Sequence, residues 1–249
     1  MLEGYYKEKE KRSEHGLPAL PVNAEQVQAI ADLFESGKGS DELLILLENE
    51  VPPGVDEAAY VKAAFLKDIA LENISTVLIP PQKAIEMLGT MLGGYSVEAL
   101  VTILKAKKYG AEAASALKHT ILVYDSFNDI FDLQDENEYA KEIINSWANA
   151  DWFLSKPEVE TEIALTVYKV SGETNTDDFS PAKEAWSRPD IPLHAQAFLK
   201  WSENISDPLD KLRELQTDGS KLAFVGDVVG TGSSRKSAAN SMLWHMGDE

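Results

Sequence analysis

The N-terminal half of the chain alternates between short amphipathic stretches and turns rich in glycine and proline. Within each stretch apolar residues recur every three or four positions, the spacing of a helix with one buried face. The pattern predicts helices over about 24–36, 41–51, 56–71, 81–92, 96–109, 111–124 and 138–154. Pairs of these helices recur about every 30–45 residues without a strict sequence motif, which favours an α-solenoid of HEAT or armadillo type over a plain helical bundle.

The segments around these helices have few apolar positions. Residues 1–22 are expected to be a charged lead-in that ends in an extended, proline-bearing segment. The acidic run 125–138 holds six carboxylates but lacks the residue order of a calcium loop, so a solvated connection is favoured over a cation site. His119 lies among apolar residues of a predicted helix, and we expect it to be packed there rather than to bind a ligand.

The pattern changes after Pro157. Residues 163–170 alternate β-branched and aromatic residues with polar ones, which predicts a strand that pairs with a short buried strand at 222–225. A polar loop is expected over 172–182, an irregular segment follows at its prolines, and helices are predicted at 194–201 and 207–215. The second half is therefore the beginning of an α/β domain.

A loop with glycines at 226, 230 and 232 follows the second strand, and a helix with apolar residues at 238, 239, 242, 243 and 246 is predicted after it. Ser233 or Ser234 stands where the N-cap belongs. Free N–H groups and the helix dipole at such an end, beside Arg235 and Lys236, predict a turn that binds a carboxylate or phosphate. The loop lacks both the Walker A ending and the third glycine of the dinucleotide fingerprint. A plain capped helix remains the alternative.

Composition narrows the class of protein further. A formal net charge of −19 argues against broad nucleic-acid binding, although a local basic pocket of Arg188, Arg235 and Lys236 is compatible with it. The chain has no cysteine, which excludes disulfides, thiol nucleophiles and thiolate metal ligands. No apolar run is long enough for a membrane span, and the charged N-terminus has no signal-peptide core, so we expect a cytoplasmic protein without membrane contact.

Three motifs give a resemblance to a known family. They are the Gly-Ser-Ser-Arg-Lys-Ser-Ala segment at 232–238, the segment Gly172–Ala182, and Ala185–His194 with its Trp-Ser-Arg-Pro core. Together with the helical first half, they resemble bacterial aconitate hydratase of the B class, in the aconitase superfamily. The resemblance covers essentially the whole chain. It implies a multidomain fold, with an all-α HEAT-like superhelix over 1–157 and the N-terminal portion of an α/β swivel domain over 158–249. Because the chain stops soon after the predicted helix, we expect this domain to be truncated and its sheet incomplete.

The resemblance also implies an activity. Members of the family are lyases of the tricarboxylic acid cycle that interconvert citrate and isocitrate through cis-aconitate, with a [4Fe–4S] cluster held by cysteines. This chain has no such ligand. We therefore expect it to be the N-terminal part of a longer enzyme, to bind no cluster or other metal itself, and to be inactive alone.

Carried over residue by residue, the resemblance makes Ser233 the base that removes the substrate proton. It assigns Ser234, Arg235 and Arg188 to substrate binding, together with Ser233 itself. Thr176, Asp177 and Asp178 would line the same site; the two aspartates either orient its groups or only form an Asx-type turn.

Other functions remain open at this stage. The helical half could be an interaction module that forms a homodimer or contacts the rest of the enzyme, and family members are reported to bind RNA, which the charge of this chain does not favour. An isopropylmalate-isomerase-like swivel segment is a further alternative, although that subunit lacks such a helical domain. A serine hydrolase is not supported, because no Gly-x-Ser-x-Gly is present.

Overall fold

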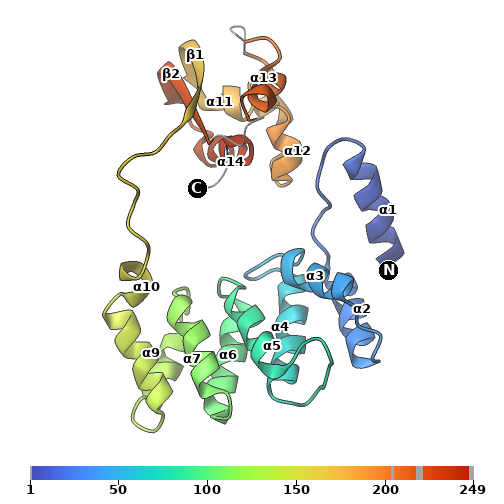
Figure 1. Ribbon diagram of the computed structural model, residues 1–249, viewed down its shortest axis with the longest axis vertical. Helices are drawn as coiled ribbons and strands as arrows, with labels where there is room; N and C mark the ends of the chain where they lie inside the picture. Colours follow the sequence, from blue (N-terminus) through green and yellow to red (C-terminus); the bar gives the residue numbers. More distant parts are fainter. Residues whose placement is uncertain (1, 203–204, 217–220, 247–249) are drawn as a thin grey trace. The chain divides into compact units, whose positions relative to one another are not determined.

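The computed structural model describes residues 2–202, 205–216 and 221–246. Contacts divide the chain into two compact units (Figure 1): a helical unit up to Glu14 and over Ala19–Pro157, and a C-terminal unit formed by His15–Pro18 and the chain from Glu158 onward. The described residues are mainly helical and contain one small parallel sheet, consistent with an all-α N-terminal domain followed by a partial α/β segment. Within the described ranges, no helix is long and apolar enough to cross a membrane.

The helical unit consists of short helices joined by tight turns. Their bounds are α1 Leu2–Ser13, α2 Ala24–Glu35, α3 Asp41–Asn49, α4 Glu57–Ala70, α5 Pro81–Gly89, α6 Tyr95–Ala106, α7 Gly110–His119, α8 Ser126–Leu133, α9 Glu138–Ala148 and α10 Asp151–Leu154. From α4 to α7, helices pack against those one and two places along the chain: α4 contacts α5 and α6, and α5 contacts α6 and α7. This part of the unit is therefore built from contacts between near neighbours in sequence.

Capping residues set where several helices begin. The Asn23 side chain accepts from the Gln26 N–H at 2.9 Å, and the Gln26 side chain accepts in return from the Asn23 N–H at 2.9 Å. The side chains of Ser40 and Asp56 cap α3 and α4, each by accepting one hydrogen bond from an N–H of the first turn. These contacts satisfy N–H groups that the first turn leaves unpaired, and they confirm the predicted starts of all three helices.

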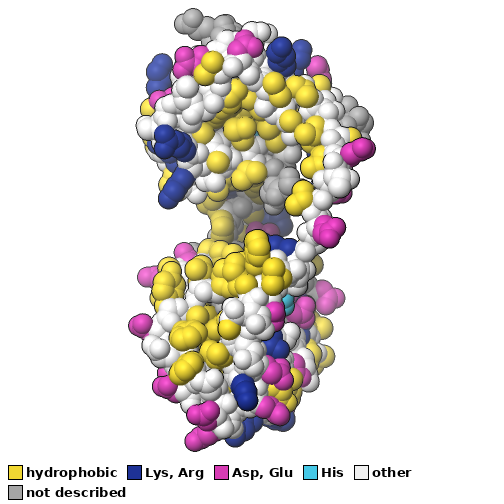
Figure 2. Space-filling view, turned by 90° about the vertical axis from the view of Figure 1, so that its left-hand side faces the viewer, with side chains coloured by type: hydrophobic (Ala, Val, Ile, Leu, Met, Phe, Trp, Pro, Cys, Tyr) yellow, Lys and Arg dark blue, Asp and Glu magenta, His cyan; other side chains and the backbone are white. Residues whose placement is uncertain are grey.

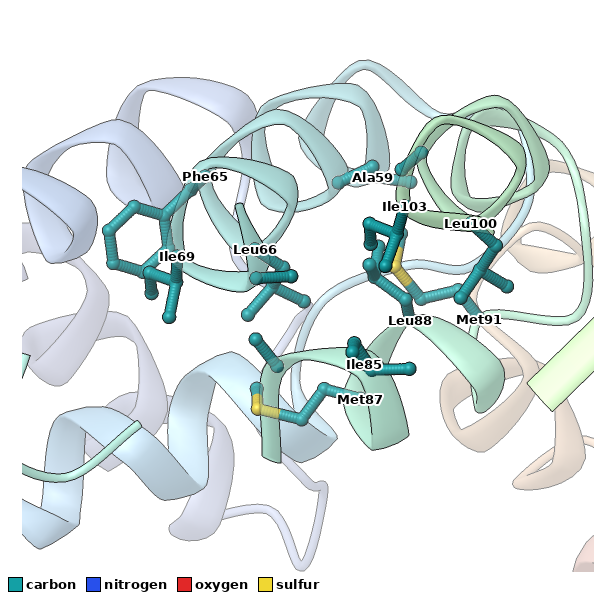
Figure 3. Close-up of a cluster of buried hydrophobic side chains, with 14 of the residues drawn as sticks. Ala59, Phe65, Leu66, Ile69, Ile85, Met87, Leu88, Met91, Leu100 and Ile103 are labelled. Carbon is teal, nitrogen blue, oxygen red and sulfur yellow. The ribbon is translucent and has the colours of Figure 1, made fainter. Parts of the chain in front are cut away.

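The apolar faces of α4, α5 and α6 meet in a continuous core (Figure 3). Leu66, Leu88 and Leu100, one from each helix, have no exposed surface. The predicted buried face of α2 is also confirmed, since Val27, Ile30, Ala31 and Phe34 are all buried. Burial of a large aliphatic side chain contributes about 1.5–3 kcal/mol, so this core is the main source of the unit's stability.

In the helical unit, two segments without a helix prediction are helical; in the C-terminal unit, part of the predicted loop 172–182 is helical as well, at residues 176–179. The lead-in contains α1, where Tyr5 is buried and a Lys7–Glu3 pair spans one turn at 2.7 Å. The acidic run contains α8, because the apolar stripe of Phe127, Ile130 and Phe131 has helical spacing that the surrounding carboxylates conceal. The prediction of a solvated connection there was wrong.

Other corrections concern helix ends in this unit. The predicted helix 138–154 is broken at Ala150, which has a φ of +55° and separates α9 from α10. The helix predicted to reach Tyr124 ends at His119. His119 is exposed, so its predicted packing was also wrong; as the last residue of α7, it lines an open groove of about 400 Å³ beside α5.

The C-terminal unit contains a two-stranded sheet and several short helices. Its elements are β1 Thr166–Asn175, α11 Thr176–Phe179, the 3-10 segment η1 Ala182–Ser187, α12 Ile191–Ala195, α13 Pro208–Leu215, β2 Leu222–Thr231 and α14 Arg235–Met246. The strands run parallel, with Thr166 opposite Leu222 and Asn175 opposite Thr231. The predicted pairing is confirmed, and so is the helix at 207–215.

Both strands are longer than predicted. β1 continues through Gly172, and β2 continues through Gly226 and Gly230, which were expected to lie in loops. The register of the pair shifts between Val170 and Glu173 and again at Thr174, so the ladder tolerates irregularities where glycine stands. The predicted helix 194–201 lies earlier, at α12, because the Asp190 side chain caps it by accepting from Leu193 N–H at 3.2 Å.

A small aromatic core holds the C-terminal unit together. The rings of Phe179 and Phe198 stack at 5.2 Å, and Phe224 meets Phe179 edge-on at 4.8 Å. α14 faces this core with Ala238 and partly buried methionines, whereas Ala239 and Leu243, predicted on the same face, are exposed. The predicted end of the domain at 247–249 lies outside the described residues.

Candidate functional site

The carboxyl ends of β1 and β2 lie side by side at one edge of the sheet. Because the strands are parallel and Asn175 pairs with Thr231, the chain leaves both strands at the same place. β1 leads directly into α11, and β2 leads through residues 232–234 into α14. The two segments that the sequence singled out are thereby brought together.

The start of α11 is fixed by a reciprocal cap. The Asn175 side chain accepts from the N–H groups of Asp177 and Asp178 at 2.8 and 3.1 Å, and Asp178 accepts from the Asn175 N–H at 2.8 Å. The carboxylate of Asp178 is therefore engaged in backbone capping. The exposed carboxylate of Asp177 is left to face the neighbouring turn.

A glycine allows the turn after β2 to approach α11 closely. Gly232 has a φ of +96°, and a Cβ there would lie 2.7 Å from Thr176 Oγ1. The hydroxyl of Thr176, a buried residue, accepts from the N–H of Ser234 at 3.1 Å. Thr176 thus attaches the turn to α11.

Ser234 lies at the centre of a polar chain. Its hydroxyl donates to Asp177 Oδ1 at 3.0 Å and accepts from Arg188 Nη2 at 3.3 Å. The same Nη2 donates to the carbonyl of Ser180 at 3.1 Å. Arg188 Nε is buried and donates to no described group. An unsatisfied buried donor costs about 1–3 kcal/mol, a cost that a bound acceptor would remove.

Ser233 and Arg235 flank Ser234 at the exposed start of α14. No hydrogen bond or ion pair joins their side chains to another residue that the structure describes. Lys236 is exposed beside them. The first turn of this twelve-residue helix therefore presents a hydroxyl and two cations where the helix dipole is positive.

His194, for which the sequence analysis suggested no role, lies next to this site. Its Nε2 is 2.8 Å from Ser180 Oγ, and its Nδ1 is 2.8 Å from Ser187 Oγ. Burial lowers the pKa of His194, and the positive charge of Arg188 acts in the same direction. The three residues lie in the motif segments Gly172–Ala182 and Ala185–His194, but no single helix or strand spans them, so the sequence did not show that they meet.

The residues of this chain do not fit the iron–sulfur cluster that the resemblance implies. Such clusters are held by thiolates, and the chain has no cysteine. In the part of the chain that the structure describes, no three histidine or acidic side chains are grouped so that they could hold a metal ion.

Family models match both units. Residues 4–153 match the model described as the aconitate B N-terminal domain, and residues 165–249 match the model of the aconitate hydratase 2 N-terminus. The first match alone covers more than half of the chain.

Individual relatives agree with these matches. The chain is 50% identical to aconitate hydratase B of Salmonella typhimurium over 260 residues, and 50% identical to that of Escherichia coli over the same length. It is 50% identical to aconitate hydratase B of Synechocystis sp. over 253 residues. Each alignment covers all of this chain but only 29–30% of the relative. The chain, which spans about a third of the length of these relatives, belongs to the aconitate hydratase B family.

Proposed function

We propose that this chain is the N-terminal part of an aconitate hydratase, a lyase that interconverts citrate and isocitrate through cis-aconitate. In this proposal the C-terminal unit is a portion of a swivel domain and supplies one wall of the active site. The observation that carries the proposal is the hydrogen-bonded chain from Arg188 through Ser234 to Asp177, beside the exposed Ser233 and Arg235.

The two serines have different surroundings, which supports different roles. The hydroxyl of Ser234 already donates to Asp177 and accepts from Arg188, so its proton and one lone pair are engaged. Ser233 has no such partners among the described residues. The helix dipole and the nearby guanidinium of Arg235 favour an alkoxide there. We therefore assign to Ser233 the removal of the substrate proton, and to Ser234 the binding of substrate.

Arginines provide the complementary charge for a tricarboxylate. A guanidinium can bind a carboxylate through two parallel hydrogen bonds, which fixes its orientation as well as neutralising its charge. Arg188 is held in place by Ser180 and Ser234, whereas Arg235 is exposed at the start of α14. We assign one substrate carboxylate to each arginine.

The proposed chemistry of this chain is limited to substrate binding and proton removal. The family's cluster has no ligands here, so no part of the reaction that needs it is assigned to this chain. Purified alone, the chain is expected to bind tricarboxylates weakly and to show no turnover. Robust turnover by the 249-residue chain would contradict the proposal.

A citrate complex tests the site directly. Crystals of the chain soaked with citrate should show density between the guanidinium groups of Arg188 and Arg235. Tricarballylate, which lacks the hydroxyl, should bind at the same place, because the carboxylates determine binding. Citrate found only elsewhere on the surface, or no binding at millimolar concentration to the longer enzyme's site, would count against the assignment.

For the helical unit we infer a HEAT-like superhelix that contacts the rest of the enzyme or a second copy. The half-exposed rings of Phe127 and Phe131 stack at 6.0 Å, and Phe127 also stacks on Trp147. Figure 2 shows hydrophobic side chains interspersed with acidic ones on the visible face of this unit. Light scattering of the wild type and of Phe127→Ser should reveal whether this surface supports self-association.

The alternatives are less well supported. An isopropylmalate-isomerase-like segment is not favoured, because residues 4–153 match the aconitate B N-terminal domain. RNA binding would need a basic footprint that a net charge of −19 does not favour. A cytoplasmic location remains a prediction.

A further inference from the structure

We propose that His194 is a positioning residue, which holds the guanidinium of Arg188 in the orientation that binds a substrate carboxylate. This inference rests on the proposed function and assigns a role to His194, which lies at the end of the motif Ala185–His194 but received no role from the resemblance. His194 touches neither Ser233 nor Ser234 and acts only through the segment that carries Arg188.

The imidazole joins the two ends of one loop. Ser180 precedes the η1 segment and Ser187 is its last residue, and each hydroxyl lies 2.8 Å from a different ring nitrogen of His194. The ring is almost completely buried, with 3% of the residue exposed. His194 therefore ties the two ends of this loop together, in addition to the Arg188–Ser180 hydrogen bond and the Lys200–Glu184 ion pair.

The surrounding acceptors determine which nitrogen carries the proton. The Ser187 hydroxyl donates to the carbonyl of Glu184 at 2.8 Å, and Nδ1 of His194 lies 3.1 Å from the same carbonyl. A carbonyl oxygen can only accept, so Nδ1 must carry the hydrogen and donate to this group. Nε2 is then the acceptor for the hydroxyl of Ser180. Burial lowers the pKa of His194 and so favours this neutral form, in which Nε2 accepts from Ser180.

Both serines that contact His194 also help to position Arg188. Ser180 accepts from Arg188 Nη2 through its carbonyl, and Ser187 directly precedes Arg188 in the chain. When the imidazole is removed, the two ends of the loop separate more easily and the guanidinium loses its fixed place beside Ser234. A carboxylate held by Arg188 is bound in both the ground state and the transition state, so the effect falls on KM more than on kcat.

The test uses the longer holoenzyme that carries this chain as its N-terminal part. His194→Ala should raise KM for citrate and isocitrate about tenfold while kcat changes less than about threefold. Ser180→Ala removes the hydroxyl but keeps the carbonyl that contacts Arg188, and it should give a smaller change in the same direction. His245→Ala is the matched control, because His245 is also a partly buried histidine with a lowered pKa, but it bonds to the Ala195 carbonyl at 2.7 Å. It should leave KM unchanged.

A double-mutant cycle separates positioning from general destabilisation. If His194 acts through Arg188, the variant with both His194→Ala and Arg188→Ala should have the same KM as Arg188→Ala alone. Additive effects on KM, or loss of kcat with an unchanged KM, would overturn the inference. An unchanged KM in Arg188→Ala itself would instead contradict the proposed function. Crystals of the His194→Ala chain provide a readout without activity: the Arg188–Ser234 contact should be lost.

Discussion

The helical unit and the C-terminal unit are held together in different ways. The former has a large apolar core shared by helices that are near neighbours in sequence. Many of its polar side chains bond within their own helix or turn, as the caps at Asn23 and Asp56 do. The latter has a small aromatic core, and its polar side chains connect segments far apart in sequence, as Ser234 does with Arg188 and Asp177. The helical unit is therefore stabilised mainly by burial of apolar side chains. In the C-terminal unit, the polar contacts mainly fix the positions of a few side chains at the candidate site.

Removing the proposed base should have the largest effect on function with little effect on folding. In the longer enzyme, Ser233→Ala is expected to lower kcat by about 10³-fold, the scale of a lost general base. The unfolding free energy should hardly change, because this exposed side chain has no partner among the described residues. Ser115→Ala, at an exposed serine of α7, serves as the control and should change neither quantity. A tenfold effect or less would remove Ser233 from the role of base.

The converse is expected for the helical core. Leu100→Ala removes a fully buried side chain where α4, α5 and α6 meet, and should lower the unfolding free energy by about 2–5 kcal/mol. Urea denaturation followed by circular dichroism measures this loss. Ile45→Ala, at a residue 54% exposed, should cost far less. Equal losses at both positions would show that burial does not dominate in this unit.

A buried lysine should make the unfolding free energy of the helical unit depend on pH in the alkaline range. Burial lowers the pKa of Lys62 to about 8, although the charge of Glu48 opposes this. Between about pH 8 and 10.5 the unfolded chain binds more protons than the folded one, so the unfolding free energy should rise with pH, by roughly 3 kcal/mol across the window. Lys62→Met should abolish this slope, whereas Lys67→Met on the same helix should keep it. A slope that survives in Lys62→Met would contradict the assignment.

The close approach of the turn after β2 to α11 can be tested at its glycines. Gly232→Ala should lower the unfolding free energy by about 1–3 kcal/mol and weaken citrate binding, because its Cβ would collide with Thr176 Oγ1. Gly230→Ala shares the positive φ, at +83°, but has no atom within 4 Å of the added Cβ. It should cost less and leave citrate binding intact, as measured by calorimetry. Matching losses of citrate affinity would mean that contact with α11 does not place the turn.

The smallest effect is expected on mild acidification. Burial lowers the pKa of both His194 and His245, and both lie in the C-terminal unit. A lowered folded-state pKa means that their contribution is fully present above about pH 6.5 and is lost as the pH falls toward the folded value. The C-terminal unit should therefore lose stability as the pH falls below about 6.5, before the helical unit does. Hydrogen exchange measured separately for the two units checks this order, and an earlier loss in the helical unit would refute it.

Local patterns determined most of the helical unit and the outline of the second. The caps at Asn23, Ser40 and Asp56 and the apolar face of α2 could be predicted because each depends on residues within one or two turns. The pairing of the strand near 166 with that at 222 could also be predicted, because the first shows alternation and the second a short apolar run. The motif around Ser233 and Arg235 identified the family because it is a contiguous run of residues.

The tertiary structure decided what depends on distant contacts. The apolar stripe of α8 lay hidden among carboxylates. Gly226 became part of a strand because Val170 of β1 pairs with it, and Gly230 lies in the irregularity between the paired Val229 and Thr231. The different roles of Asp177 and Asp178, and the link from His194 to Arg188, arise from segments that meet only after folding. The sequence shows short-range periodicity directly. It carries no direct signal for a hydrogen bond between side chains far apart in the chain, such as Arg188 and Ser234, which lie 46 residues apart.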